Sequence, residues 1–396
     1  MSSLGQVFES FISNLQSELG ENDPTGPTSI DTFLNATEIC EKYGYEVEEH
    51  TVTTEDGYML TLHRVLGTEN TTSNGKVVLL MHGIMDSADS WVLQGKDQAL
   101  AFILADEGFD VWMGNARGNK YSLQHKELTS KQSEFWEFTW EEIGLFDLPA
   151  MIDHILNITE KEKLYYVGHS QGTTAFFVMT SLRPEYNRKV SMMFALAPVA
   201  WMKNAKSPLV RMFSPAYKIL GSLLSTLNTF SLNKGLFNEV LSMMCSLYDN
   251  RCENTLFMIT GSTKNINASM LPVILGHMPT GSSAHQFVHY GQLVLNGRFC
   301  RYDFGEKKNM EYYNSPTPPD YDLSQVSVPV SMFAGGNDWL SDPTDVNQLK
   351  TKLPNVFDYK MLDDYSHLDF LYASLAKHKI YYKIITQIRR SQKHIF

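Results

Sequence analysis

The sequence has 396 residues, of which 43% are hydrophobic, 12% aromatic and 19% charged, and this is ample material for a large globular core. Its formal net charge of −11 argues against nucleic acid or another polyanion as a partner. No apolar run reaches the roughly 18 residues that a membrane-spanning helix needs, so we expect no transmembrane segment.

The targeting signals in the sequence point in two directions. Glu9 and Glu18 stand where a signal peptide would be apolar, which predicts either a processed form with a new start or an intracellular protein. Four Asn-x-Ser/Thr sequons favour instead a glycosylated protein of a secretory compartment, although each of them also fits chance. The sequons lie at Asn35, Asn70, Asn157 and Asn267.

The four cysteines allow three complete pairings. Cys245 and Cys252 are close enough in sequence for a short-loop disulfide, whereas Cys40 and Cys300 fit free, buried thiols. This count is too low to identify the redox compartment.

Strand-like and helix-like segments alternate along the first half of the chain. Residues 1 to about 30 are polar and we expect weak order there, while residues 45–66, centred on Glu55-Asp56-Gly57, predict a β-hairpin. Further strands are predicted at Val77–Met81, Asp110–Met113, Leu164–Val167, Met192–Leu196 and Val328–Ala334. Helices are predicted at Ala99–Gly108, 140–158, 173–182 and from about Leu368. Such alternation indicates an α/β fold with a mostly parallel sheet flanked by helices.

The alternation stops between about Trp201 and Asp320, where the sequence is helical and irregular. Within this part, residues 216–248 hold very few charges and are rich in Leu, Met and Phe. We therefore divide the chain into a weakly ordered segment 1–35, an α/β core 36–200 and 321–396, and an inserted, mainly helical cap or lid 201–320. No zinc-ligand spacing, phosphate-binding loop or dinucleotide fingerprint is present, so we expect no metal and no cofactor.

Residues 165–174, YYVGHSQGTT, hold a Gly-x-Ser-x-Gly motif between a predicted strand and a predicted helix. In such an elbow the serine hydroxyl is exposed above the sheet, and glycines avoid collisions with the neighbouring strand and helix. We predict Ser170 as a nucleophile, with an incidental loop as the alternative.

A serine nucleophile needs a base and an orienting acid, which follow an elbow of this kind in the order Ser, acid, His. Asp338 comes just past the predicted strand that ends at Ala334 and is the candidate acid. Asp345 is a competitor. Asp342, which precedes Pro343, better fits the cap of the following helix.

The candidate base is His367, in a turn just before the C-terminal helix. The other histidines of the second half either precede the acid or lie in a basic helix: His277, His285, His289, His378 and His394.

Residues 79–84, LLMHGI, run from a strand into a His-Gly turn. We predict that the backbone N–H groups of Ile84 and Gln171 hold the negative charge that develops on a substrate carbonyl. His82 looks catalytic but precedes the serine, so we expect it to fix the loop by hydrogen bonds. In the predicted reaction His367 takes the proton of Ser170, and water later clears the acyl-enzyme.

Several motifs in the same order make the chain similar to the acid lipases, which are the gastric, lingual and lysosomal lipases and their insect relatives. The resemblance runs from about Ala36 to about Ser374. Its motifs are HG at 82–83, AFILAD at 101–106, NARGN at 115–119, EFW at 134–136, YVGHSQGTT at 166–174, GGNDWLSDP at 335–343 and HLDF at 367–370.

This resemblance implies an α/β-hydrolase core with an inserted cap, part of which acts as a lid, and a secreted or lysosomal address. It also implies the same nucleophile, acid, base and oxyanion donors as the residues themselves suggest. Cys252 falls where the family has a paired cap cysteine, with Cys245 at a shorter spacing than expected. The sequence departs from the family in lacking its usual signal peptide. It also has Ile84-Met85-Asp86 in place of a leucine-rich turn, a change expected to alter the acyl pocket.

We therefore predict a lipase that hydrolyses neutral lipid esters, triacylglycerol and/or steryl esters, at a lipid–water interface. Peripheral contact with a membrane or lipid droplet fits this function, and the oligomeric state stays open. A carboxylesterase or thioesterase for smaller soluble esters is the alternative. An inactive hydrolase-fold protein that binds or stores lipid fits less well, because all three catalytic candidates are present.

Overall fold

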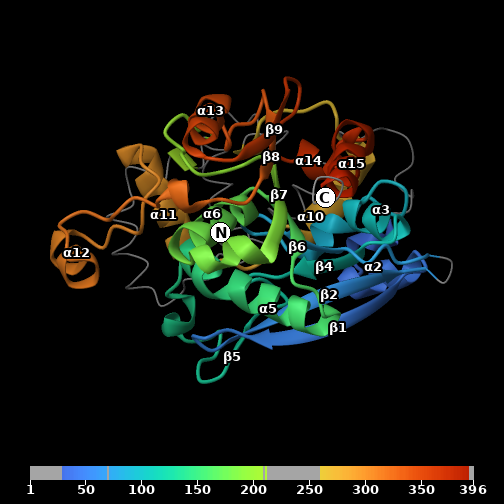
Figure 1. Cartoon of the computed structure of the whole chain (residues 1–396), viewed down its shortest axis with the longest axis horizontal. Coiled ribbons are helices and arrows are strands. Elements are labelled where there is room, and N and C mark those ends of the chain that lie inside the picture. The colour runs from blue at the N-terminus through green and yellow to red at the C-terminus, as the bar shows by residue number, and fades with distance from the viewer. Residues whose placement is uncertain (1–28, 69–70, 208–209, 212–258, 392–396) are drawn as a thin grey trace, which may run out of the picture.

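The computed structural model describes residues 29–68, 71–207, 210–211 and 259–391 (Figure 1). Within these residues the centre of the molecule is a nine-stranded sheet in the order β1-β2-β4-β3-β6-β7-β8-β9, with β5 attached to β2. The strands are β1 Glu46–Thr53, β2 Tyr58–Gly67, β3 Val77–Met81, β4 Asp110–Gly114, β5 Gln124–His125, β6 Leu164–His169, β7 Val190–Leu196, β8 Val330–Gly335 and β9 Val356–Leu362.

The predicted hairpin is confirmed at one edge of this sheet. β1 and β2 pair antiparallel, and Gly57 in the connecting turn has φ +100°, a conformation that glycine adopts readily. β2 also pairs antiparallel with β4, whereas all pairs from β4 through β3, β6, β7 and β8 to β9 are parallel. The predicted mostly parallel sheet is therefore confirmed.

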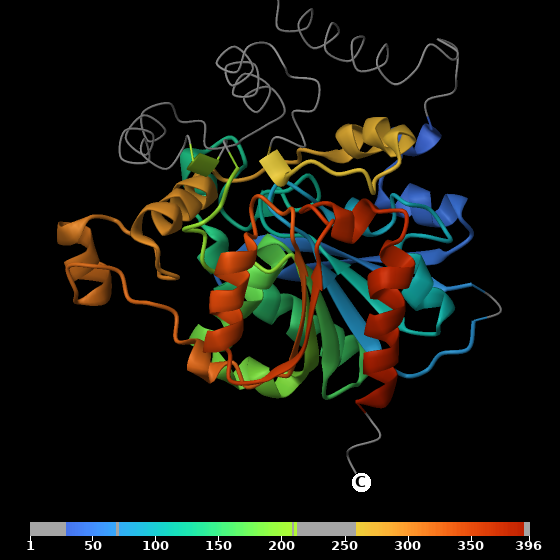
Figure 2. The same cartoon turned by 90° about the horizontal axis from the view of Figure 1, so that it is seen from above.

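Helices cover both faces of the sheet because alternate residues of its buried strands point to opposite sides. Val77 and Leu79 of β3 belong to the core formed with α5, α6 and α13, whereas Val78 and Leu80 belong to the core formed with α3 and α15. Figure 2 shows these two helical layers beside the strands. The α-helices are α2 Ala36–Lys42, α3 Leu100–Asp106, α4 Trp140–Glu142, α5 Leu148–Thr159, α6 Gln171–Leu182, α10 Leu271–His277, α11 Ala284–Asn296, α12 Glu306–Tyr313, α13 Pro343–Lys352, α14 Asp369–Tyr372 and α15 Tyr382–Arg390.

Short 3-10 and π-helical turns join these elements. The 3-10 helices are η1 Ile30–Thr32, η2 Ala88–Trp91, η3 Ser133–Trp136, η5 Pro184–Lys189, η6 Ala268–Met270 and η7 Leu323–Gln325, and the π-helical turns are η4 Ile143–Asp147 and η8 Lys377–Tyr381. The predicted helix 140–158 is thus built as α4, η4 and α5 in succession. Pro149 lacks the N–H that would donate to the carbonyl of Leu145 four residues earlier, and this carbonyl accepts instead from Arg183 Nη1 at 3.2 Å.

Between β7 and β8, the described residues form η6, α10, α11, α12 and η7 and contribute no strand to the sheet. Figure 1 shows α12 standing out from the body of the molecule, next to α11. Cys245, Cys252 and Asn70 lie outside the described residues, as do 1–28 and the charge-poor segment 216–248. Cys40 and Cys300 are free and buried, as predicted. Among the described helices, none is long and apolar enough to cross a membrane.

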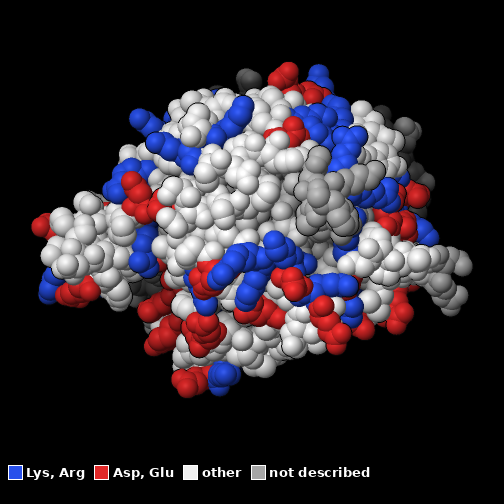
Figure 3. Space-filling model, in the orientation of Figure 1, with Lys and Arg blue, Asp and Glu red and all other residues white. Residues whose placement is uncertain are grey.

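The basic C-terminal helix α15 packs against the core, with Ile388 fully buried. Two of its charges are neutralised by neighbours: Lys383 Nζ lies 2.6 Å from an Asp358 carboxylate oxygen, and Arg389 pairs with Glu107. Over the face shown in Figure 3, Lys and Arg are interspersed with Asp and Glu. α15 is therefore a core-packing element whose outer face is charged.

Candidate active site

Ser170 stands in the sharp turn between β6 and α6 with φ +53°, a conformation that non-glycine residues rarely adopt. Its N–H donates to the Leu196 carbonyl at 3.0 Å, which ties the turn to β7. A Cβ on Gly172 would collide with the Met81 carbonyl oxygen, and one on Gly168 would lie 2.9 Å from the Gly172 carbonyl carbon. The motif therefore needs both glycines for close approach of backbones.

The structure brings Ser170, His367 and Asp338 together, from the ends of three separate strands. Ser170 Oγ lies 2.7 Å from His367 Nε2, and His367 Nδ1 lies 2.8 Å from Asp338 Oδ2. Because a carboxylate only accepts, Nδ1–H donates to Asp338, and the Nε2 lone pair faces the serine hydroxyl. This is the tautomer that a general base requires.

Asp338 is fully buried and held on both oxygens. Its Oδ1 accepts from the Leu340 and Ser341 N–H groups at 2.9 and 2.8 Å, which leaves Oδ2 for His367. The two competing carboxylates lie elsewhere. Asp342 caps α13 by accepting from Thr344 N–H at 2.8 Å, as predicted, and Asp345 accepts from the backbone N–H and side-chain amide of Asn204.

The hydrogen bonds of His82 join its own turn to the segment that follows β4. Its Nδ1–H donates to the Gly83 carbonyl at 2.7 Å, and its Nε2 accepts from Ala116 N–H at 3.1 Å and from the Asn119 amide. Burial lowers the pKa of His82 to about 4, so the ring is neutral. The geometry matches the predicted role of fixing the loop.

His169 is a residue that the sequence reasoning missed. Its Nε2–H donates to the His367 carbonyl at 2.9 Å, and burial lowers the pKa of His169 to about 3. It therefore supports the backbone of the candidate base as a neutral ring. Its place in the motif next to Ser170 is the one sequence signal that marks it.

The two predicted oxyanion donors flank the serine. Gln171 is the first residue of α6, so helix geometry leaves its N–H without an intrahelical acceptor. Ile84 lines the same cleft as Ser170. Thr280, from the segment between β7 and β8, makes two hydrogen bonds to the turn 84–86. Its N–H donates to the Met85 carbonyl at 2.8 Å and its hydroxyl to the Asp86 carbonyl at 2.9 Å.

Ser170 and His367 lie in an apolar cleft of about 1030 Å³, counting its open mouth. The core and the segment between β7 and β8 both supply its walls. Its apolar lining includes Val199, Met202, Ile259, Leu275, Met278, Pro279, Phe287, Leu340 and Leu368. Such a lining suits a fatty acyl chain or another apolar group. Within the described part of the chain, no group of His, Cys, Asp or Glu residues is arranged to hold a metal ion.

Comparison with known proteins identifies the family. A model of a partial α/β-hydrolase lipase region matches residues 36–95, and a model of the α/β-hydrolase fold matches residues 76–374. Gastric triacylglycerol lipase of Rattus norvegicus is 40% identical, over 92% of this chain and 93% of that protein. The chain belongs to the acid lipase family.

Two further comparisons, one of sequence and one of structure, agree with this family and fold. This acid lipase is 38% identical to the lysosomal acid lipase/cholesteryl ester hydrolase of Homo sapiens, over 92% of this chain and 94% of that protein. The crystal structure of a soluble variant of monoglyceride lipase from Saccharomyces cerevisiae matches it with a TM-score of 0.56 at 14% identity, over 92% of this chain and 99% of the other, and supports the fold alone. The predicted family, the α/β-hydrolase fold and the serine-hydrolase class are confirmed.

Proposed function

We propose that this acid lipase hydrolyses the carboxylic ester bonds of neutral lipids through a Ser170–His367–Asp338 triad and an acyl-enzyme. One observation carries the proposal: His367 hydrogen-bonds both Ser170 and Asp338, at 2.7 and 2.8 Å, beside an apolar cleft. The chemistry needs a nucleophile, a base in the correct tautomer and an acyl pocket, and these features supply all three.

In the proposed reaction, Ser170 Oγ attacks the ester carbonyl while its proton passes to His367 Nε2. The resulting oxyanion accepts hydrogen bonds from the N–H groups of Ile84 and Gln171. Asp338 stabilises the imidazolium, which then returns the proton to the leaving alkoxide. Water repeats the sequence on the acyl-enzyme: His367 takes a water proton, the hydroxyl adds to the carbonyl, and the fatty acid leaves as Ser170 is restored.

Triacylglycerol and steryl esters are the substrates we propose. The apolar lining of the cleft suits their long hydrocarbon groups. The names of two relatives, gastric triacylglycerol lipase and lysosomal acid lipase/cholesteryl ester hydrolase, point to the same two classes. We further propose that residues 201–320 form a cap over the core and that the enzyme acts at a lipid–water interface, because α10 and α11 contribute Leu275 and Phe287 to the cleft.

A substrate panel tests this proposal. Emulsified triacylglycerol, emulsified cholesteryl ester and a short water-soluble ester are compared over a range of pH, with S170A as the control. We expect hydrolysis of at least one emulsified lipid, together with fluorophosphonate labelling that S170A abolishes. Activity confined to soluble esters would favour the carboxylesterase alternative, and a folded wild type that neither hydrolyses nor labels would favour an inactive binding protein.

We also propose a secreted or lysosomal address with N-linked glycans. Three of the four sequon asparagines, Asn35, Asn157 and Asn267, are exposed, and two relatives are named as gastric and lysosomal enzymes. Protein from its native tissue is expected to lose apparent mass on treatment with a peptide N-glycosidase. Unchanged migration would contradict glycosylation at these sites. A Cys245–Cys252 disulfide stays a prediction, since both residues lie outside the described part.

A further inference from the structure

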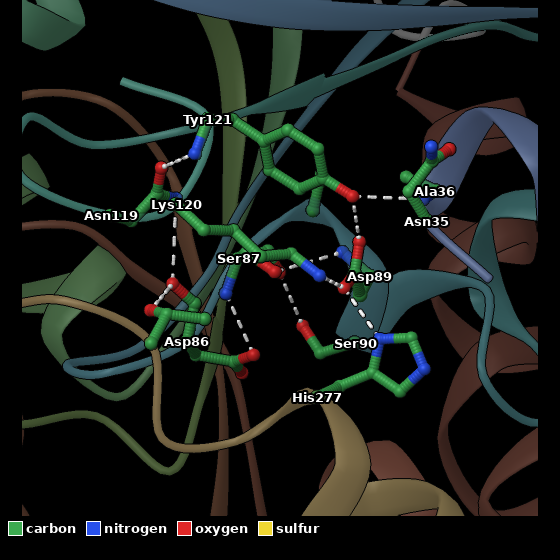
Figure 4. A network of polar contacts seen from close by, with 12 residues as sticks. Asn35, Ala36, Asp86, Ser87, Asp89, Ser90, Asn119, Lys120, Tyr121 and His277 are labelled. Carbon is green, nitrogen blue, oxygen red and sulfur yellow. Dashed lines mark hydrogen bonds and ion pairs between the residues drawn. The ribbon is translucent and has the colours of Figure 1, made fainter. Parts of the chain in front are cut away.

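His277, the last residue of α10, is buried and makes two short hydrogen bonds through its ring. Figure 4 shows the one to Asp89. Nε2 lies 2.6 Å from the Asp31 backbone carbonyl, and Nδ1 lies 2.6 Å from Asp89 Oδ2. A carbonyl oxygen can only accept, so Nε2 carries a hydrogen. Nδ1 must carry one too if Asp89 is a carboxylate, which would make His277 an imidazolium.

The surroundings of Asp89 require the carboxylate. Asp89 is fully buried, and its Oδ2 also accepts from the Lys120 ammonium group. Its Oδ1 accepts from the Tyr121 hydroxyl at 2.6 Å, and this hydroxyl has its hydrogen free because it accepts from Ala36 N–H. Lys120 and Tyr121 thus both donate to the Asp89 side chain, and Figure 4 shows them on its two oxygens together with His277. Burial alone would raise the pKa of Asp89, but the His277 hydrogen bond and the Lys120 charge lower it to about 2.

Other buried histidines of this protein differ from His277 in their partners. His289 Nε2–H donates to the Cys300 carbonyl at 3.0 Å, and His169 Nε2–H donates to the His367 carbonyl. Among the described residues, the Nδ1 atoms of His169 and His289 have no partner, so no acceptor calls for a second ring proton, and burial lowers the pKa of each to about 3. His277 donates from both nitrogens.

The elements packed around α10 supply the charged and titratable groups that face His277. α10 packs against η1, η2 and η6, and η6 carries no titratable side chain. The titratable groups that interact with the His277–Asp89 pair include Asp31, Cys40, His63, His82, Asp86, Lys120, Tyr121 and Tyr372. Asp31 is itself paired with Lys42 at 2.5 Å. Lys120, whose side chain is about one-third exposed, pairs with the same Asp89 oxygen as His277.

The segment after His277 leads directly to the active site. Met278 and Pro279 line the cleft, and Thr280 makes the two hydrogen bonds to the Met85 and Asp86 carbonyls. We propose that His277, as an imidazolium, is a positioning residue that holds α10 on Asp89 and thereby fixes, through Thr280, the turn that carries the oxyanion donor Ile84. This inference rests on the proposed function, since it assigns Ile84 that role.

Deprotonation of His277 reverses the interaction at one atom. The Nδ1 lone pair then faces the Asp89 carboxylate, and one hydrogen bond becomes a repulsive contact. α10 is expected to loosen, and Thr280 to release the 84–86 turn. The chemistry at Ser170 is unaltered, but the backbone donors no longer meet the oxyanion, so the loss falls on kcat rather than on KM.

Imidazole ¹⁵N chemical shifts in the intact protein test the protonation state. At pH 6 we expect two protonated ring nitrogens for His277 and one each for the internal controls His169 and His289, with assignment by single His→Gln variants. A neutral His277 at this pH would overturn the proposal. This measurement does not depend on whether Ser170 is catalytic, so it separates a failure here from a failure of the proposed function.

Kinetics on a short soluble ester test the positioning role. H277Q is expected to lower kcat by about 10²-fold with KM little changed, and T280V, which loses only the hydroxyl bond, by about 10-fold. In the wild type, kcat should fall together with the loss of the second ring proton in the His277 ¹⁵N signal. The exposed-histidine control H378Q should match the wild type.

Unchanged kcat in T280V, or a wild-type kcat that is constant while His277 loses its proton, would overturn the positioning role. Both outcomes can be read even if H277Q fails to fold. If instead S170A keeps wild-type activity, the proposed function fails while the ¹⁵N result stands.

Discussion

At the scale of single residues, hydrogen-bond partners distinguish the histidines near Ser170 from one another. Asp338 fixes the tautomer of His367, so D338N, which presents an amide N–H or a weaker acceptor, is expected to favour the wrong tautomer and lower kcat by about 10⁴-fold. D342N is the matched control: asparagine still caps α13 and only the ion pair with the exposed Lys206 is lost, so stability changes by less than about 1 kcal/mol and kcat is unchanged. Hydrolysis of a soluble ester and thermal melts of both variants check this, and equal losses in the two would contradict it.

The sequence predicts the residues of the site that follow a fixed chain order, and it misses those defined by contacts between distant segments. Ser170, Asp338 and His367 each stand just after a strand, and the structure brings them within hydrogen-bond distance. His277 could not be recognised in this way. Its position before the acid excludes it as the base, and its positioning role depends on Asp89, which lies 188 positions earlier in the chain.

At the scale of elements, the glycines of the elbow allow the backbones of β6, the turn at Ser170 and α6 to pack closely against their neighbours. G172A places a methyl group against the Met81 carbonyl of β3, and a backbone must move to relieve the contact. We expect a loss of about 1–3 kcal/mol in unfolding free energy and labelling of Ser170 by a fluorophosphonate that is slower by about 10²-fold. In the control G75A, the new Cβ lies 4.0 Å from Lys161 Nζ, so only the strain of its φ of +74° lowers stability and labelling should be unaffected. Wild-type labelling of G172A would refute the tight packing inferred for the elbow.

Apart from the β1–β2 hairpin, which its Asp-Gly turn marks, the strands that the sequence predicts are those buried on both faces, such as β3 and β6. β9 escaped prediction because its side chains are mostly half-buried and include Asp358 and Lys360, which interrupt any apolar run. It is defined instead by parallel pairing with β8 and by the Lys383 ion pair from α15. Local periodicity cannot encode such an edge strand, because its partners come from elsewhere in the chain.

At the scale of the whole molecule, two buried carboxyl groups beside the oxyanion turn set opposite dependences of stability on pH. Burial raises the pKa of Asp86 from 3.8 to about 7. The folded state therefore binds a proton that the unfolded state releases, and stability falls as pH rises from about 4 to about 7. Asp89 has the opposite sign. Its folded pKa of about 2 lies below the unfolded value, so its contribution is present above about pH 4 and is lost as pH falls toward 2.

These two groups together predict maximal stability near pH 4. Urea unfolding between pH 3 and pH 8 should show the unfolding free energy of the wild type falling toward neutral pH more steeply than that of D86N, by on the order of 3 kcal/mol. The reason is that the amide in D86N does not titrate, so this variant has no proton to release at position 86 as pH rises. The exposed-carboxylate variant D364N serves as the control and should keep the wild-type slope. Parallel curves for the wild type and D86N would mean that Asp86 is ionised in the fold, and the stability optimum would then have to come from other groups.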